Sequence, residues 1–184
     1  MEPLSTESIS ADVRDQVTMQ DYSKKTPIDG VQIIELPLMI DDGGQFMELG
    51  RFRSGMHQQF PGFEVKQVNY SEMVPGVIKA THLHFNQEDI WFIPPHHRLL
   101  IGLKDLRAGS PTEGTVMRFV LGGGKAKVLY IPRGVAHGAG NLWDKNAAIV
   151  YFVNNAFSAE PSECDEKRLP WDVFGADFWE LSKE

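Results

Sequence analysis

Hydrophobic and polar residues alternate along this chain in short segments, and no stretch repeats apolar residues at a helical spacing over a long run. From Val31 onward, short apolar segments are each bounded by Gly, Pro or Asn, which is typical of strands separated by turns. The segments read VQIIELPLMI, FMELGRF, EVKQVNYSEM, IWFIPP, MRFVLGGG, KVLYIPRG and AAIVYFVNNAF. The pattern predicts an all-β fold of the barrel or jelly-roll kind.

The two ends of the chain differ from this pattern. Residues 1–26 scatter single apolar residues among Ser, Asp and Glu, so we expect an N-terminal arm, and residues 27–184 are expected to form one domain. Pro37 suits an edge strand or a strand that changes partners, and turns are expected at residues 41–44 and 59–62. The C-terminal stretch LPWDVFGADFWELSKE is compatible with a short helical segment on the barrel wall.

One expected strand has two unequal faces. Val68 and Tyr70 fall on one side, and Gln67, Asn69 and Ser71 fall on the other. A polar row of this kind is either the solvent side of a half-buried strand or the interior of a barrel that binds a polar ligand.

Three of the six histidines lie in two related segments, Gly76–Glu88 (GVIKATHLHFNQE) and Pro132–Asn141 (PRGVAHGAGN). The alternation of a strand puts His82 and His84 on one face, and a turn at Pro132 and Gly134 leads to His137. If the two segments lie side by side, the three imidazoles form a cluster. The other three histidines are expected to be ordinary loop or core residues: His57, His96 and His97.

Composition narrows the class of partner. The formal net charge is −7, and the chain has no cluster of Lys and Arg of the kind that binds nucleic acid. Cys164 is the only cysteine, so no intrachain disulfide is possible. No signal-peptide core and no uncharged run of membrane-spanning length occurs, so we expect a cytoplasmic protein without a membrane partner.

The spacing of the histidines and Glu88 resembles the two-part motif of cupins. In metal-dependent cupins, residues placed like His82, His84, Glu88 and His137 supply imidazole and carboxylate ligands, and open coordination positions remain for substrate. The motif departs from that pattern at Pro95, where a glycine is usual.

Flanking segments resemble a narrower family, the dTDP-4-dehydrorhamnose 3,5-epimerases. DDGGQFME is similar to its D-x-R-G-x-F-x-E segment, KQVNYSEMVPGVIKATH to its Q-x-N-x-S…G-V-x-R-G-x-H run, and DLRAGSPTEG to its D-x-R-x-x-S-P-T-x-G turn. The resemblance covers roughly residues 31–172. It implies a cupin-type jelly-roll barrel, usually a homodimer, that acts without a metal or other cofactor on a nucleotide-linked 4-keto-6-deoxy sugar.

The resemblance also implies roles for single residues. His82 falls on the family's catalytic base and Tyr151 on its proton donor. The positions that contact substrate are Phe46, Glu48, Gln67, Asn69, Lys79 and His137, with Lys79 replacing an arginine. By family habit, Phe46 and Glu48 reach the neighbouring subunit's pocket.

Several positions depart from the family. Gly43 replaces an arginine, the segment Asn86–Asp89 has no counterpart of a lysine in the catalytic site, and Phe157 replaces a second tyrosine. The aspartate that supports the family's base has no evident counterpart. Three functions therefore stay open: a nucleotide-sugar epimerase, a metal-dependent cupin enzyme, and a sugar-binding barrel without catalysis.

Overall fold

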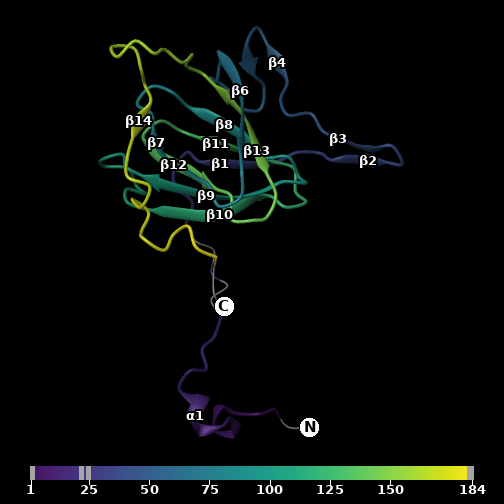
Figure 1. The fold of residues 1–184 in the computed structure, drawn as a ribbon, viewed down its shortest axis with the longest axis vertical. Helices are drawn as coiled ribbons and strands as arrows, with labels where there is room; N and C mark the ends of the chain where they lie inside the picture. The colour runs from purple at the N-terminus through teal and green to yellow at the C-terminus, as the bar shows by residue number, and fades with distance from the viewer. Residues whose placement is uncertain (1–2, 21–22, 24–25, 182–184) are drawn as a thin grey trace.

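The computed structural model describes residues 3–20, 23 and 26–181, and it is built from two five-stranded antiparallel sheets (Figure 1). The first sheet has the order β1 (Gln32–Glu35), β11 (Lys127–Ile131), β8 (Asp89–Phe92), β13 (Ala147–Val153), β6 (Gln67–Met73). The second has the order β10 (Val116–Gly122), β9 (Arg98–Asp105), β12 (Val135–Gly140), β7 (Ile78–Leu83), β14 (Lys167–Arg168). This arrangement is a jelly roll of two open sheets and confirms the predicted all-β, cupin-type fold.

The main core lies between the sheets. Trp91 and Ile93 of the β8 segment, and Leu99, Ile101 and Leu103 of β9, are buried in it. Alternate residues of β8, Ile90 and Phe92, join a second core on the outer face of the first sheet. The segment between β1 and β6 covers that face with Leu36, Phe60 and Phe63. Because both of its faces are covered, β8 is apolar at successive positions.

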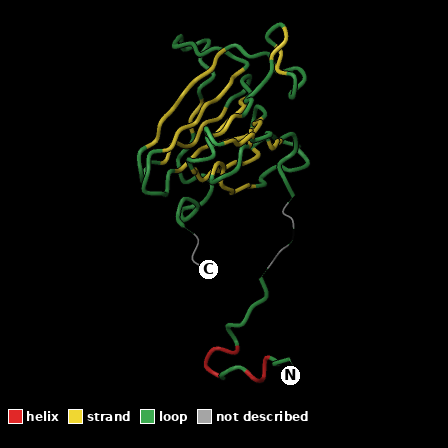
Figure 2. The backbone as a smooth tube through the Cα atoms, turned by 90° about the vertical axis from the view of Figure 1, so that its right-hand side faces the viewer, coloured by secondary structure: helices red, strands yellow, loops and turns green. Residues whose placement is uncertain are grey.

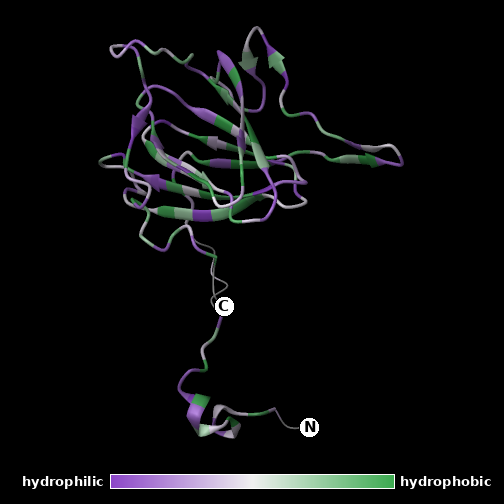
Figure 3. Ribbon diagram, viewed as in Figure 1, coloured by the Kyte–Doolittle hydropathy of each residue, from purple (hydrophilic) through white to green (hydrophobic). Residues whose placement is uncertain are grey.

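Pro37 separates β1 from β2 (Met39–Asp41), which pairs with β3 (Gly44–Phe46) and not with β1's partner. The predicted change of partners is therefore confirmed. The long strand expected from Phe46 to Phe52 is wrong: residues 47–51 connect β3 to the short hairpin of β4 (Phe52–Arg53) and β5 (Met56–His57). The β2–β3 hairpin projects from the body (Figure 1), and part of its ribbon has the colour of hydrophobic residues (Figure 3). Its apolar residues Met39, Ile40 and Phe46 are exposed.

The C-terminal segment forms turns, and no helix is present there within the described residues. Trp179 is buried against Gly102 and Gly140, and its indole N–H donates to the carbonyl oxygen of Trp171. A Cβ at Gly102 would lie 2.6 Å from the Phe178 ring and 3.0 Å from that of Trp179, and one at Gly140 would lie 3.0 Å from the Trp179 ring, so both positions need a small residue. The segment thus lies on the jelly-roll wall as predicted, but it is held there by aromatic packing and not by a helical face.

The peripheral helices are in the N-terminal arm instead. A 3₁₀ turn (Thr6–Ser8) and α1 (Ala11–Arg14) lie away from the two sheets (Figures 1 and 2). No helix among the described residues is long and apolar enough to cross a membrane. The boundary between arm and domain at residues 26 and 27 stays a prediction.

Candidate active site

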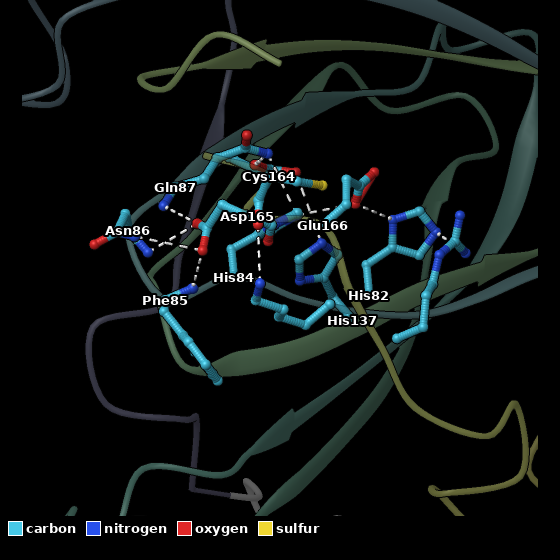
Figure 4. Close-up of polar contacts among 12 residues, drawn as sticks. His82, His84, Phe85, Asn86, Gln87, His137, Cys164, Asp165 and Glu166 are labelled. Carbon is cyan, nitrogen blue, oxygen red and sulfur yellow. Dashed lines mark hydrogen bonds and ion pairs between the residues drawn. The ribbon is translucent and has the colours of Figure 1, made fainter. Parts of the chain in front are cut away.

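The three predicted histidines converge in the space between the sheets (Figure 4). His82 on β7 lies directly opposite His137 on β12 in the strand register, so the two side chains share the inner face of the second sheet. His84 follows two residues after His82, and its ring centroid is 5.2 Å from that of His137. One ring nitrogen from each of the three lies within 4.8 Å of the others.

Backbone carbonyls fix two of the imidazoles in one tautomer. Nδ1 of His84 donates to the carbonyl oxygen of Asp165, and Nδ1 of His137 donates to that of Val135, each at 2.9 Å. Since a carbonyl oxygen only accepts, each ring carries its proton on Nδ1 and has its lone pair on Nε2. The Nε2 lone pair of His84 accepts the side-chain N–H of Gln87 at 3.3 Å, whereas Nε2 of His137 has no hydrogen-bond partner. Burial lowers the pKa of His137 to about 4, so this ring is neutral at physiological pH.

Asp89 is the carboxylate beside the cluster, which the sequence did not single out. It accepts hydrogen bonds from the Trp91 indole (2.9 Å) and from Gln87 (2.8 Å), and it lies 3.7 Å from Nε2 of His137. Glu88, the carboxylate expected with the histidines, is absent from their cluster and bonds instead to the Asn154 side chain. Successive side chains of a strand alternate, so one position decides which carboxylate faces inward, and the inward set of β8 begins at Asp89.

The polar row of β6 faces the interior. Gln67, Asn69 and Ser71 are partly buried, whereas Val68 and Tyr70 are 55% and 65% exposed. In β6 the polar residues are thus the less exposed ones, the reverse of a solvent-facing polar row. This favours the interpretation that the row lines a ligand-binding interior.

Tyr151 stands beside this row and on the opposite sheet from His82. Register places Asn69, Tyr151 and Trp91 side by side across β6, β13 and β8. Burial and then the nearby carboxylates Asp89 and Glu166 raise the pKa of the Tyr151 phenol. The phenol therefore keeps its proton at neutral pH and remains a potential acid.

His82 is held between two charged residues of β14 and its flank. Arg168 lies opposite His82 in the register and donates from its guanidinium to Nε2 at 2.8 Å. Because an arginine only donates, Nε2 carries the lone pair and the ring proton is on Nδ1, 3.6 Å from the carboxylate of Glu166. The bond with His82 lowers the pKa of Glu166 to about 2, so this residue is an anion at neutral pH.

A small cavity joins these groups. It has a volume of about 70 Å³ and contacts His82, His84, Asp89, Tyr151 and Glu166. A second cavity of about 240 Å³ shares Tyr151, Gln87 and Glu166 with it and extends to Gln67 and Asn69. The two cavities are neighbours, because they share these three lining residues, and we refer to them together as the recess.

The remaining predicted contacts are divided between this recess and the projecting hairpin. Lys79 lines the smaller cavity, and its ammonium donates to the Ser71 hydroxyl and to the carbonyl oxygen of Glu72. Phe46 is 62% exposed on β3, and Glu48 forms an ion pair with Arg51, so neither lines a recess cavity of its own chain.

The expectation for the other histidines is confirmed. His57 is buried among Phe52, Phe60 and Phe152, and its Nδ1 accepts the Gln59 N–H. His96 and His97 lie in a turn, where Nδ1 of His97 accepts the Ala148 N–H.

A model of the family described as dTDP-4-dehydrorhamnose 3,5-epimerase matches residues 25–172. The chain belongs to this family. It is 39% identical over 145 residues to the spore coat polysaccharide biosynthesis protein SpsL of Bacillus subtilis (79% of this chain, 91% of that one). It is also 32% identical to a dTDP-4-dehydrorhamnose 3,5-epimerase of Shigella flexneri, covering 80% of each chain.

Solved structures of the epimerase family share the fold. A dTDP sugar isomerase from Desulfovibrio desulfuricans superposes with a TM-score of 0.69 at 25% identity, over 87% of this chain and 94% of that one. An epimerase from Legionella pneumophila, in complex with dTDP-4-keto-L-rhamnose, gives 0.68 at 25% identity over 86% and 83%. Membership confirms the predicted class, an isomerase of the nucleotide-sugar epimerase type.

Proposed function

We propose that this protein inverts a carbon next to the ketone of a nucleotide-linked 4-keto-6-deoxy sugar, with His82 as the base and Tyr151 as the acid. The observation that carries the proposal is the placement of these two side chains on opposite sheets around one recess. An inversion needs a proton acceptor on one face of the sugar and a proton donor on the other.

The first step transfers a proton to Nε2 of His82. The C–H bond beside the ketone breaks, its electron pair forms the carbon–carbon double bond of an enolate, and the carbonyl π pair moves to the oxygen. Glu166 stabilises the resulting imidazolium through the proton on Nδ1.

The second step returns a proton from the other side. The enolate carbon takes the phenolic proton of Tyr151 and the ketone re-forms. The phenolate then regains a proton from solvent, and the His82 imidazolium releases its extra proton to solvent, so both residues return to their starting states. The raised pKa of Tyr151 keeps the acid protonated until this step.

The nucleotide sugar is held by the polar row and by the nearest cation. Gln67 and Asn69, linked to each other by a 2.6 Å hydrogen bond, present amide groups to sugar hydroxyls, and Lys79 attracts the diphosphate. His137 packs against Trp91 and lies 3.7 Å from Asp89, two residues that line the smaller cavity, so we expect it to hold them in place.

The assembly that best explains Phe46 and Glu48 is a homodimer. The β2–β3 hairpin extends from its own sheets with Met39, Ile40 and Phe46 exposed, and a second copy would cover these side chains. In that dimer, Phe46 and Glu48 would contact the substrate of the partner subunit. We place the reaction in the cytoplasm, the compartment expected from the sequence.

The test is solvent exchange. The purified protein is incubated in D₂O with a panel of nucleotide-linked 4-keto sugars, chosen by which of them raises the melting temperature. We expect deuterium to enter at a carbon adjacent to the ketone of the stabilising sugar. Stabilisation without exchange would leave a binding protein in place of an enzyme and would overturn the proposal.

A metal-dependent enzyme is the second candidate because two imidazoles are already oriented as metal ligands. His84 and His137 each donate Nδ1–H to a carbonyl, and Nε2 of His137 is buried without a hydrogen-bond partner. Nε2 of His84 accepts the Gln87 side-chain N–H at 3.3 Å, and a metal would have to displace that bond. His82 would complete a three-histidine set with open positions that polarise a substrate oxygen. The fourth ligand proposed by the sequence pattern, Glu88, does not join it. Metal analysis of protein purified without chelator tests this candidate: a stoichiometric ion lost in His84→Ala supports it.

A further inference from the structure

The base of the proposed reaction, His82, already accepts a hydrogen bond in this structure, and we call the donor of that bond its cap. Arg168 donates to Nε2 of His82, the one nitrogen of that ring that carries a lone pair. Nε2 cannot accept a proton from carbon while it accepts this bond, so the guanidinium must leave Nε2 when the substrate enters. The question is where the cation then goes.

Strand geometry keeps Arg168 on the inner face. It pairs with His82 across β14 and β7, and residues two apart on a strand share a face, which also brings Glu166 to the same imidazole. Lys167 points the other way and donates to the carbonyl oxygen of Cys164. Arg168 is exposed, so its guanidinium can change position without disturbing the core.

The recess contains negative charge but little positive charge. Asp89 and Glu166 line the small cavity, and among the described residues that line it Lys79 is the single lysine or arginine. The Lys79 ammonium is already engaged by the Ser71 hydroxyl and a backbone carbonyl. An enolate forming beside two carboxylates needs a cation close to its oxygen.

The position of Arg168 fits that need. The carbon that loses its proton approaches Nε2 of His82, and the oxygen that gains charge is two bonds from this carbon. A donor in contact with Nε2 therefore reaches the oxygen by a small rotation of its own side chain. The guanidinium presents several N–H groups in one plane.

We propose that Arg168 is a catalytic residue with two positions: it caps Nε2 of His82 in the free enzyme, and it moves to the ketone oxygen of the bound sugar, where it stabilises the enolate. The inference rests on the proposed function. It assigns to this chain a contribution from its C-terminal strand that acts in the chemical step and not in nucleotide binding.

The test compares Arg168→Gln and Arg168→Lys with Lys167→Gln, a matched control on the opposite face of the same strand. At saturating substrate, Arg168→Gln is expected to lower the rate constant of deuterium exchange by about 10² to 10³ with little change in KM, as for loss of one oxyanion donor. Arg168→Lys should recover part of the rate, and Lys167→Gln should match wild type. Equal melting temperatures of the variants would show that the fold is intact.

A second measurement does not depend on turnover. At one fixed pH, the ¹⁵N resonance of His82 Nε2 should shift between wild type and Arg168→Gln in the absence of substrate, and wild type should move toward the variant when the sugar nucleotide binds. An unshifted resonance would show that the cap does not exist and would overturn the inference.

The kinetic outcomes separate the possibilities. A raised KM with unchanged kcat in Arg168→Gln would make Arg168 a diphosphate-binding residue and would refute its role in the enolate step. If wild type and Arg168→Gln exchange deuterium at the same rate, Arg168 has no role in the enolate step, and the proposed function still stands. Absence of exchange in wild type, with every sugar of the panel, would defeat the proposed function and this inference together.

Discussion

At the scale of the residue, the proposed reaction depends on which ring nitrogen of His82 accepts the proton from the sugar. Glu166 faces Nδ1 and Arg168 faces Nε2. In the proposed reaction, Nδ1 is the supported nitrogen and Nε2 the reacting one. The supporting carboxylate could not be predicted from sequence, because Glu166 lies 84 positions from His82 in an irregular acidic stretch. Only the pairing of β14 with β7 brings it there.

Glu166 gives a prediction at this scale. Glu166→Gln removes the anion that orients His82, so we expect the rate constant of exchange to fall by about 10- to 100-fold, less than the loss expected for removing the base itself. Glu166→Asp keeps the carboxylate and should recover part of the rate in the same exchange assay. Glu163→Gln, which changes a carboxylate that bonds to Ser158, is the control. A wild-type rate for Glu166→Gln would contradict the supporting role.

At the scale of the element, the D-x-R-x-x-S-P-T segment after β9 is a structural clamp. The buried Asp105 carboxylate accepts hydrogen bonds from Arg107, Ser110 and Thr112. Arg107 also donates to the carbonyl oxygen of Asp29, which ties the start of the domain to this turn. These bonds, those from Arg107 above all, hold the pKa of Asp105 well below its ordinary value of 3.8.

The clamp predicts how stability depends on pH. A carboxylate with a lowered pKa in the folded state binds fewer protons there than in the unfolded chain, so its contribution is complete above about pH 3.8 and is lost as the pH falls below that. Asp105→Asn should lower the free energy of unfolding by about 3 kcal/mol at neutral pH and weaken the pH dependence below pH 4. Urea unfolding at several pH values measures both effects, with the exposed Asp144→Asn as the control. Parallel pH curves for Asp105→Asn and wild type would exclude the clamp.

Features that depend on interactions within one strand are predictable from the sequence, and features that depend on distant residues are not. Alternation within one strand was enough to place His82 and His84 on one face and to find the row of Gln67 and Asn69. The cupin spacing predicts Glu88 as the carboxylate beside the histidines, but the structure places its neighbour Asp89 there. The alternation Asp89, Trp91, Ile93 marks the inward face of β8. The helical segment predicted at the C-terminus is wrong because Trp179 anchors this segment against glycines more than 35 residues earlier in the chain. A periodic pattern within the segment itself cannot indicate such a contact.

At the scale of the whole molecule, the projecting hairpin is the feature that one chain leaves unexplained. Ile40 is 73% exposed and Phe46 is 62% exposed, on strands that pair only with each other. An isolated two-stranded hairpin with exposed apolar side chains is only marginally stable in water. A second copy of the chain would bury these side chains.

The dimer prediction follows from this hairpin. Light scattering at micromolar concentration should give the mass of a homodimer, and Ile40→Asp should shift the equilibrium toward monomer with a loss of activity, because the partner's pocket would lose Phe46 and Glu48. Asp42→Asn, at the tip of the same hairpin, serves as the control. A fully active monomer would refute the shared pocket.

The most direct test of the central claim is deuterium exchange and inversion, followed by NMR on the same nucleotide-linked 4-keto sugar, for wild type, His82→Asn, Tyr151→Phe and His84→Ala. We expect His82→Asn to lose exchange by about 10²- to 10⁴-fold. Tyr151→Phe should still exchange the proton that His82 removes but should lose inversion, because only the returning acid is missing. If Tyr151→Phe inverts the sugar at the wild-type rate while His84→Ala loses activity together with a stoichiometric bound metal, the His82 and Tyr151 mechanism is wrong.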